Sequence, residues 1–160
     1  MVYVEATIPI FYHEVRTEPE MVARRQWTRQ WWDNRRADCD VVTSRAVLDE
    51  LADGDYPTKD EVLALVQGIR LLSNDPPVAE IVDVYIARSV MPRDPLGDAL
   101  HLALASYHHC EFLLTWNCIH LANANKFRHI QRVDSIPGLG VPSIVTPLEL
   151  LGGQADASGG

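Results

Sequence analysis

The sequence predicts a three-layer α/β/α domain, in which helices cover both faces of a central, mostly parallel sheet. Short β-type segments alternate with helical segments along the chain, which is the order of a parallel sheet built with crossover helices. Residues 112–116 form a nearly continuous apolar segment, as expected for a strand that a parallel sheet buries on both faces. Residues 96–109 have a helical pattern and are apolar on nearly every side, which is typical of a central, buried helix.

The individual elements follow from local signals. Strands are predicted at residues 2–5, 40–43, 112–116 and 143–146. Helices are predicted at residues 19–34, 44–51, 58–72, 78–91 and 94–109, with a shorter one near 119–126. Ser44 is a good N-cap, and Thr58 with Glu61 forms a capping box. Asp94 is predicted to cap the last long helix, which places Asp98 one turn inside it.

Length and composition indicate one domain at residues 1–150, followed by a flexible, glycine-containing tail at residues 151–160. No apolar run approaches the ~18 residues that cross a membrane. Glu5 interrupts the first apolar stretch, which argues against a signal peptide. The three cysteines lack CxxC spacing, so we expect reduced thiols and a cytoplasmic protein.

The net charge of -8 argues against sequence-independent binding to nucleic acid, which needs many cations facing phosphates. Six of the fourteen basic residues nevertheless lie in the first 36 positions, which leaves a local basic face open. Trp27, Trp31 and Trp32 lie on the same segment. They suit either stacking on the bases of single-stranded RNA or packing against the domain, a second copy or a partner. The i,i+4 spacing of Trp27 and Trp31 favours packing.

Several polar residues are predicted at the edge of the sheet where its strands end. Glu5 ends the first strand, Asn117 follows the strand at residues 112–116, and Asp98 heads a helix that follows a strand. In a parallel α/β sheet, ligands bind at this edge. A carboxylate at the head of a buried helix is costly unless it meets a cation, a metal, an arginine or backbone donors, and these alternatives stay open for Asp98. Glu50 is a weaker anomaly of the same kind, or a solvated acid on a helix face.

Two residues near these acids have two interpretations each. His101, one turn from Asp98, either orients a ligand or water, or makes a local hydrogen bond as a buried histidine. Thr7, just past Glu5, donates either to a metal ligand or to its own loop. The histidines and cysteines at residues 108–120 match no common structural zinc spacing.

Taken in series, four motifs resemble the PIN domain and, more narrowly, the VapC-type toxins of bacterial toxin–antitoxin pairs. They are the first strand ending in Glu5, the helix carrying Glu50, the phrase Asp98-Ala-Leu-His-Leu-Ala-Leu-Ala, and Leu-Leu-Thr-Trp-Asn117. The resemblance covers residues 2–147 in the family's order. It implies a parallel-sheet nuclease fold, acidic residues that bind Mg²⁺ or Mn²⁺, endonucleolytic cleavage of RNA, a cognate antitoxin and a homodimer.

Carried over by position, the catalytic and metal-binding residues are Glu5, Glu50, Asp98 and Asn117. Divalent ions of this kind prefer oxygen ligands, align a phosphate and activate a water, which suits carboxylates for phosphodiester hydrolysis. We expect Asp98 and Glu5 as direct ligands, Glu50 as a ligand or water-orienting base, and Asn117 as a neutral partner. Glu5 is one methylene longer than the family's aspartate, and Asn117 lacks the charge of the fourth one. Weak, metal-selective or absent activity is therefore among the expectations.

Three functions from different classes remain. The first is a metal-dependent ribonuclease acting as a toxin. The second is a catalytically weak PIN-like module that binds RNA or a protein, which the departures at Glu5 and Asn117 favour. The third is an unrelated α/β binder of a small ligand, although neither common glycine-rich phosphate loop is present in the sequence.

Overall fold

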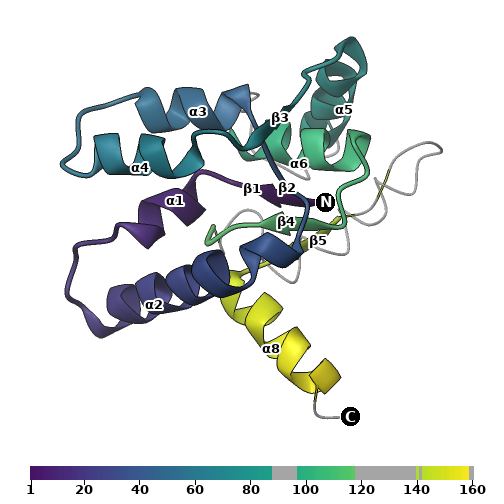
Figure 1. The fold of residues 1–160 in the computed structure, drawn as a ribbon. Helices are drawn as coiled ribbons and strands as arrows, with labels where there is room; N and C mark the ends of the chain where they lie inside the picture. The colour runs from purple at the N-terminus through teal and green to yellow at the C-terminus, as the bar shows by residue number, and fades with distance from the viewer. Residues whose placement is uncertain (88–96, 118–139, 141, 159–160) are drawn as a thin grey trace.

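The computed structural model describes residues 1–87, 97–117, 140 and 142–158, with side chains as far as residue 152. Its elements follow in the order β1 (Val2–Val4), α1 (Thr7–Tyr12), α2 (Pro19–Asn34), η1 (Arg36–Asp38), β2 (Val41–Ser44), α3 (Arg45–Ala52), α4 (Lys59–Val66), β3 (Arg70–Leu72), α5 (Pro76–Ala87), α6 (Asp98–Tyr107), β4 (Phe112–Leu114), β5 (Ser143–Val145) and α8 (Pro147–Ser158) (Figure 1). Strand and helix alternate along most of the described chain. This alternation is the basis of a parallel sheet.

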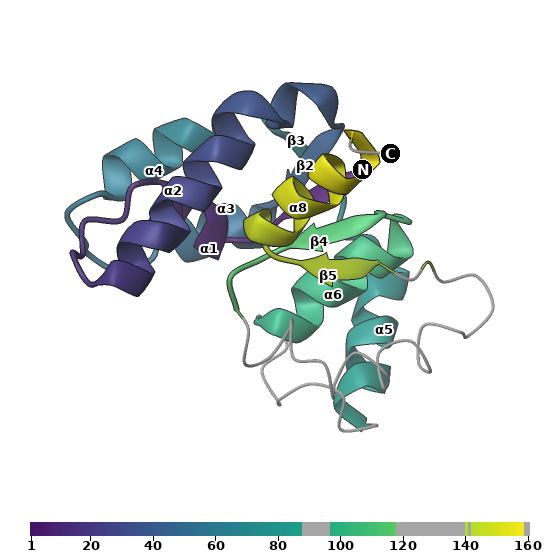
Figure 2. The same ribbon diagram turned by 90° about the horizontal axis from the view of Figure 1, so that it is seen from below.

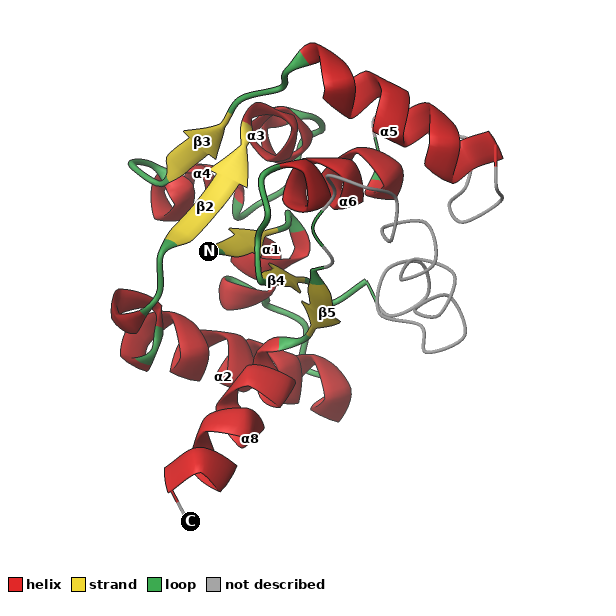
Figure 3. Ribbon diagram, turned by 90° about the vertical axis from the view of Figure 1, so that its right-hand side faces the viewer, coloured by secondary structure: helices red, strands yellow, loops and turns green. Residues whose placement is uncertain are grey.

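The sheet has five strands in the order β3-β2-β1-β4-β5, and every neighbouring pair is parallel. Helices α5 and α6 lie on one side of this sheet and α2 and α8 on the other (Figure 3). Helices α2 and α8 also pack against each other (Figure 2). The three-layer α/β/α fold class predicted from the sequence is therefore confirmed.

The central strands are buried as the apolar pattern predicts. Tyr3 and Val4 of β1 and Leu113 and Leu114 of β4 are fully buried. Because β1 lies between β2 and β4, the residues that follow it emerge near the middle of the sheet's C-terminal edge. This edge is where α/β sheets bind ligands.

Several predicted boundaries are confirmed by the structure. Helix α2 spans Pro19–Asn34, the predicted range. The Ser44 side chain caps α3 by accepting a hydrogen bond from the backbone N–H of Val47 at 3.4 Å. Gly54, shortly after this helix, has a φ of 79°, which glycine adopts without strain.

The prediction of one helix over residues 58–72 is wrong in its second half. Helix α4 ends at Val66, Gly68 adopts a φ of 88°, and β3 (Arg70–Leu72) pairs with β2. The apolar residues of β3 fit a helical spacing as well as a short strand, so periodicity alone could not separate the two. The Thr58 side chain makes no cap hydrogen bond, contrary to the predicted capping box. Helix α1 (Thr7–Tyr12), which follows β1 directly, was not predicted.

Asp98 is the first residue of α6, with Gly97 as the N-cap, so the prediction that it lies one turn inside the helix is wrong. The proposed cap, Asp94, lies outside the described residues. At this position a carboxylate interacts favourably with the helix dipole. The helix dipole therefore explains part of the presence of an acid at this position, so Asp98 by itself is weaker evidence for a metal site.

The end of the described chain differs from the predicted flexible tail. Helix α8 continues through Ser158, after Thr146 and Glu149 form a cap in which the Glu149 N–H donates to Thr146 Oγ1 at 3.4 Å. The short helix predicted near residues 119–126 falls outside the described residues. Within the described part of the chain, no helix is both long and apolar enough to cross a membrane.

The tryptophans of α2 pack inside the domain. Trp31 is 2% exposed and Trp32 is 6% exposed. Trp27 stacks on Trp116, two residues after β4, with ring centroids 6.2 Å apart and planes at 25°. Arg24 lies over the Trp116 ring, with its guanidinium carbon 5.3 Å from the centroid. The packing interpretation of this helix thus fits the structure, and Trp31 is not available to stack on RNA in the folded chain.

Candidate metal centre

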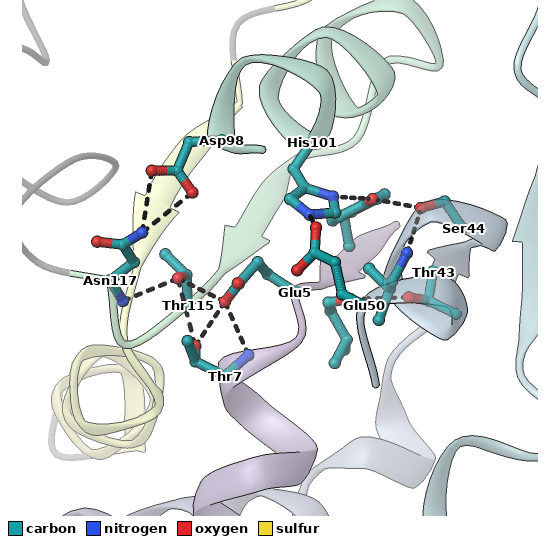
Figure 4. A network of polar contacts seen from close by, with 12 residues as sticks. Glu5, Thr7, Thr43, Ser44, Glu50, Asp98, His101, Thr115 and Asn117 are labelled. Carbon is teal, nitrogen blue, oxygen red and sulfur yellow. Dashed lines mark hydrogen bonds and ion pairs between the residues drawn. The ribbon is translucent and has the colours of Figure 1, made fainter. Parts of the chain in front are cut away.

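The four predicted site residues are carried by elements that meet at the C-terminal edge of the sheet. Glu5 follows β1, Glu50 lies on α3, Asp98 begins α6, and Asn117 comes shortly after β4. Figure 4 shows all four around the end of β1, with His101 of α6 between Glu50 and Asp98. Hydrogen bonds connect Glu5 through Thr115 to Asn117 and Asp98, whereas Glu50 contacts His101. Proximity brings Glu5, Glu50 and His101 together as one group, and Asp98 with Asn117 forms a second.

Glu5 is a buried carboxylate that is satisfied on one side only. It is 4% exposed, and its Oε2 accepts hydrogen bonds from Thr7 N at 3.0 Å, from Thr7 Oγ1 at 2.5 Å and from Thr115 Oγ1 at 2.9 Å. Its Oε1 receives no hydrogen bond from any of the residues that the structure describes. A buried carboxylate oxygen without a donor is costly unless a cation or a proton meets it.

Burial raises the pKa of Glu5, against the opposing effects of the His101 charge and the hydrogen bonds from Thr7 and Thr115. Burial therefore destabilises the ionised form of Glu5 in the protein without an added cation. A metal ion beside Oε1 would supply the missing compensation, because an opposite charge within a few ångströms favours the charged form of a carboxylate.

His101 is 1% exposed and its two ring nitrogens contact two different groups (Figure 4). Nε2 lies 2.5 Å from Glu50 Oε1, and Nδ1 lies 2.7 Å from the Tyr3 hydroxyl. The Tyr3 hydroxyl in turn lies 2.7 Å from Ser44 Oγ. Burial by itself disfavours the imidazolium, but the hydrogen bond and charge of Glu50, together with the charge of Glu5, raise the pKa of His101 above its usual value.

Glu5, Glu50 and His101 form a cluster that can hold a metal ion. One possible ligand atom from each of the three lies within 4.8 Å of the other two. The donor set of two carboxylates and one imidazole suits a divalent ion, since it brings two negative charges and leaves room for water or substrate ligands. The partly unsatisfied Glu5 fits the same interpretation. Glu50 is the adjustable member, because its side chain is 37% exposed.

Asp98 and Asn117 form the second group. The Asn117 side-chain amide donates to both Asp98 carboxylate oxygens, at 3.0 Å each. The two groups are linked because the Asn117 backbone N–H donates to Thr115 Oγ1 at 2.9 Å, and Thr115 Oγ1 donates to Glu5. Asn117 therefore binds Asp98 in the structure, and its expected role as a neutral partner at an ion stays a prediction. Convergence of all four predicted residues on a single ion stays a prediction.

A hollow of about 900 Å³ opens beside the cluster. Its lining includes Glu50, Asp98, Ser44, Arg45, Asn74 and Leu104. Glu50 and Asp98 are thus accessible from one space, whereas Glu5 is buried beneath them. A ligand in this hollow can approach the carboxylates of both groups.

The predictions for the neighbouring residues can now be compared with the geometry. Thr7 donates to the carboxylate of Glu5, a candidate ligand, through both its backbone N–H and its hydroxyl. His101 contacts Glu50, a candidate ligand, rather than a local backbone group. Of the possible zinc residues, Cys110 is buried and belongs to no metal-ligand group among the residues described, while Cys118 and His120 lie outside them.

Sequence reasoning missed Tyr3, Ser44 as a contact of Tyr3, and Thr115. A signal existed for Thr115, since it lies two residues before Asn117 in the same motif. Tyr3 gave no signal, because an aromatic residue in a buried strand is expected in any core. Only the pairing of β1 with β2 brings its hydroxyl to Ser44.

The site therefore combines a buried glutamate, a histidine with contacts at both ring nitrogens, and a hollow whose lining includes Glu50 and Asp98. This arrangement is defined by the geometry of the chain itself. Comparisons with protein-family models, with curated proteins and with solved structures found no match for this chain.

Proposed function

We propose that the chain is a metal-dependent endoribonuclease that hydrolyses phosphodiester bonds in RNA. The observation that carries this proposal is Glu5, a buried carboxylate whose Oε1 accepts no hydrogen bond from the described residues, next to Glu50 and His101 at the sheet edge where ligands bind. Mg²⁺ or Mn²⁺ bound here would supply a water of lowered pKa and compensate the charge on the phosphate. The four-motif resemblance to PIN-domain nucleases supports the same activity.

The residues of the chain have separate roles in this proposal. Glu5, held by Thr7 and Thr115, fixes one side of the ion site without moving. Glu50, on the rim of the hollow, completes the site or orients a water. Asp98 faces the same hollow and contributes a further carboxylate toward the reacting phosphate.

The biological setting proposed is the toxin of a toxin–antitoxin pair, with a cognate antitoxin and a homodimer as partners. Support for the setting comes from the sequence resemblance alone. A short reading frame for a DNA-binding antitoxin next to the gene is the expected observation. Growth arrest on expression of the chain, relieved by that neighbour, would test the setting apart from the chemistry.

Removing Asp98 tests the activity. We expect the purified protein to cleave RNA with Mg²⁺ or Mn²⁺, EDTA to abolish cleavage, and Asp98→Ala to lower the rate at least 100-fold, as loss of a positioned catalytic group does. Far-UV circular dichroism should show that the variant stays folded, since Asp98 is only half-buried. Undiminished cleavage by folded Asp98→Ala would reject this role.

A second candidate, the catalytically weak binding module, is favoured by one observation. The Asn117 amide donates to both oxygens of Asp98. A neutral side chain therefore stands where a second carboxylate would bind a metal ion more tightly. Under this alternative the chain binds RNA or a protein in the presence of Mg²⁺ without cutting. A gel-shift assay and a cleavage assay on the same RNA separate the two, because binding without products supports the module.

Asn117→Asp tests whether Asn117 lies next to the bound ion. The substitution places a carboxylate where an amide now donates to Asp98, so without metal the two acids repel and the melting temperature in EDTA should fall. A divalent ion relieves that repulsion. We therefore expect a lower Mg²⁺ concentration for half-maximal cleavage than in the wild type, and the gain should increase from about pH 6 to pH 8 as both acids ionise. An unchanged midpoint at both pH values would place Asn117 away from the ion.

A further inference from the structure

His101 is oriented by hydrogen bonds at both of its ring nitrogens. Its ring is buried, and it lies on the same face of the helix as Asp98, one turn earlier. A buried histidine needs one or two hydrogen-bond partners, which backbone carbonyls commonly provide. Here both partners are side chains from other elements, Tyr3 of β1 and Glu50 of α3.

The Tyr3 hydroxyl links Ser44 to His101. It lies 2.7 Å from Ser44 Oγ, which also accepts from the Val47 N–H as the cap of α3. The same hydroxyl lies 2.7 Å from His101 Nδ1. When Nδ1 donates its proton to the Tyr3 oxygen, a neutral ring keeps its lone pair on Nε2. Metal-binding histidines are held in this way, with the other ring N–H donated to a polar partner.

Nε2 points at the acids rather than into the core. It lies 2.5 Å from Glu50 Oε1, and His101 belongs with Glu5 and Glu50 to the cluster in which one possible ligand atom from each residue lies within 4.8 Å of the others. Without an ion, a proton on Nε2 links the ring to Glu50 at this distance, and a bound metal ion would take the place of that proton. Glu50 can move to admit a larger ion, because its side chain is 37% exposed, while the ring and Glu5 stay fixed.

We propose that His101 Nε2 is a direct metal ligand, and that the site consequently binds first-row transition ions such as Mn²⁺ and Zn²⁺ more tightly than Mg²⁺. Imidazole nitrogen is a good ligand for transition ions, whereas Mg²⁺ strongly prefers oxygen. The inference rests on the proposed function for the presence of an ion at this site, and it adds the nitrogen ligand and the class of ion. It requires only binding, so it can be tested without RNA.

The direct test detects nitrogen on bound Mn²⁺. Protein carrying nitrogen-15 in its histidine rings is titrated with Mn²⁺ and examined by pulsed electron paramagnetic resonance, which reports nuclei bonded to the ion. We expect one directly coordinated imidazole nitrogen in the wild type. The result does not depend on any variant folding. An ion surrounded only by oxygen would overturn the inference.

Substitutions then assign the nitrogen among the six histidines of the chain. His101→Asn should remove the nitrogen coupling. His108→Asn is the matched control, because His108 lies at the opposite end of α6 and contacts the Ser73 carbonyl, and it should keep the coupling. Coupling that persists in His101→Asn would contradict the assignment.

Tyr3→Phe is a milder change that keeps His101. It removes the hydroxyl that fixes Nδ1, and loss of such a supporting contact typically weakens metal binding about 10- to 100-fold. Calorimetric titration should show that decrease for Mn²⁺ and Zn²⁺, with a smaller change for Mg²⁺. Equal changes for all three ions would mean that His101 only positions Glu50.

The outcomes also separate this inference from the nuclease proposal. Nitrogen-coordinated Mn²⁺ in a protein that cleaves no RNA would leave the metal site standing and reject the nuclease. Mg²⁺-dependent cleavage together with an all-oxygen Mn²⁺ site would keep the nuclease and reject His101 as a ligand. Absence of binding by any of the three ions at millimolar concentration would overturn both.

Discussion

Glu5→Gln is expected to abolish metal-dependent cleavage and, in EDTA, to make the protein more stable than the wild type. The loss of activity follows because glutamine brings no charge to the ion site, and we expect a rate decrease of at least 100-fold. The gain in stability follows from burial. Glu5 is 4% exposed, and one of its oxygens lacks a described donor, so replacing the acid by a neutral isostere removes an uncompensated charge.

The stability difference should depend on pH in a defined direction. Burial raises the pKa of Glu5 above its ordinary value of 4.5, so the unfolded chain releases this proton first as pH rises. The contribution of Glu5 to stability is therefore fully present below pH 4.5 and is lost as pH rises through the folded-state pKa. Each pH unit in that interval costs up to about 1.4 kcal/mol for one proton. Glutamine does not titrate, so the variant's advantage should grow with pH.

The measurement is urea unfolding of both proteins in EDTA between pH 4.5 and 6.5. His101 has a raised pKa against an ordinary value of 6.5, with burial opposing and Glu50 dominating the increase, so it stays protonated over this window. The slope of the difference then reports Glu5. A variant with a constant stability difference across the window would show that Glu5 titrates as an ordinary surface acid. Added Mn²⁺ should stabilise the wild type and leave Glu5→Gln unchanged.

Glu14→Gln is the matched control, because Glu14 is also a buried glutamate but binds Arg16 instead of a metal site. Arg16 Nε lies 2.8 Å from its Oε1, and these hydrogen bonds lower the pKa of Glu14 to about 2. The sign is therefore reversed. Its stabilising contribution is present above pH 4.5 and is lost as pH falls through about 2. Glu14→Gln should be less stable than the wild type at pH 6.5, and its response to Mn²⁺ should match the wild type.

The fold was predictable from the sequence where one local signal dominated. Ser44 caps α3 and α2 spans its predicted range, because a capping hydroxyl and a proline at the helix start act over a few residues. The short strand β3 was not predictable in the same way. Its two apolar residues, Leu71 and Leu72, fit a helix and a strand equally, and only pairing with β2 decides between them.

The residues of the candidate site were also predictable from local signals, whereas their contacts with one another were not. Glu5, Glu50 and Asp98 could be proposed from the sequence because a carboxylate in an apolar context is conspicuous. The contact of Glu50 with His101, 51 positions apart in the chain, depends on how α3 and α6 lie over the sheet edge. Asp98 shows the converse error. It was placed inside the helix from a nearby cap signal, and the structure makes it the first residue of α6.

Trp31→Ala is expected to cost more stability than any other single change considered for this chain. Trp31 is among the largest fully buried side chains, and its ring meets that of Trp32 edge-on, with centroids 6.2 Å apart. Truncating a buried tryptophan removes a large apolar area and leaves a cavity, at a cost of about 3–5 kcal/mol. Against a typical total of about 5–15 kcal/mol for a domain, much of the folding free energy would be lost.

Trp27→Ala is the comparison on the same helix, since Trp27 is only partly buried and stacks on Trp116 at one face. Urea unfolding of both variants should show the larger decrease in midpoint for Trp31→Ala, while size-exclusion chromatography of the folded proteins reports association. From the sequence, the tryptophans of α2 could pack either in the core or at an interface with another chain. These two measurements distinguish the two roles. Equal, small losses of stability with a change of oligomeric state would assign the tryptophans to an interface. A loss of several kcal/mol for Trp31→Ala, with unchanged association at low urea, assigns Trp31 to the core that holds α2 against the sheet.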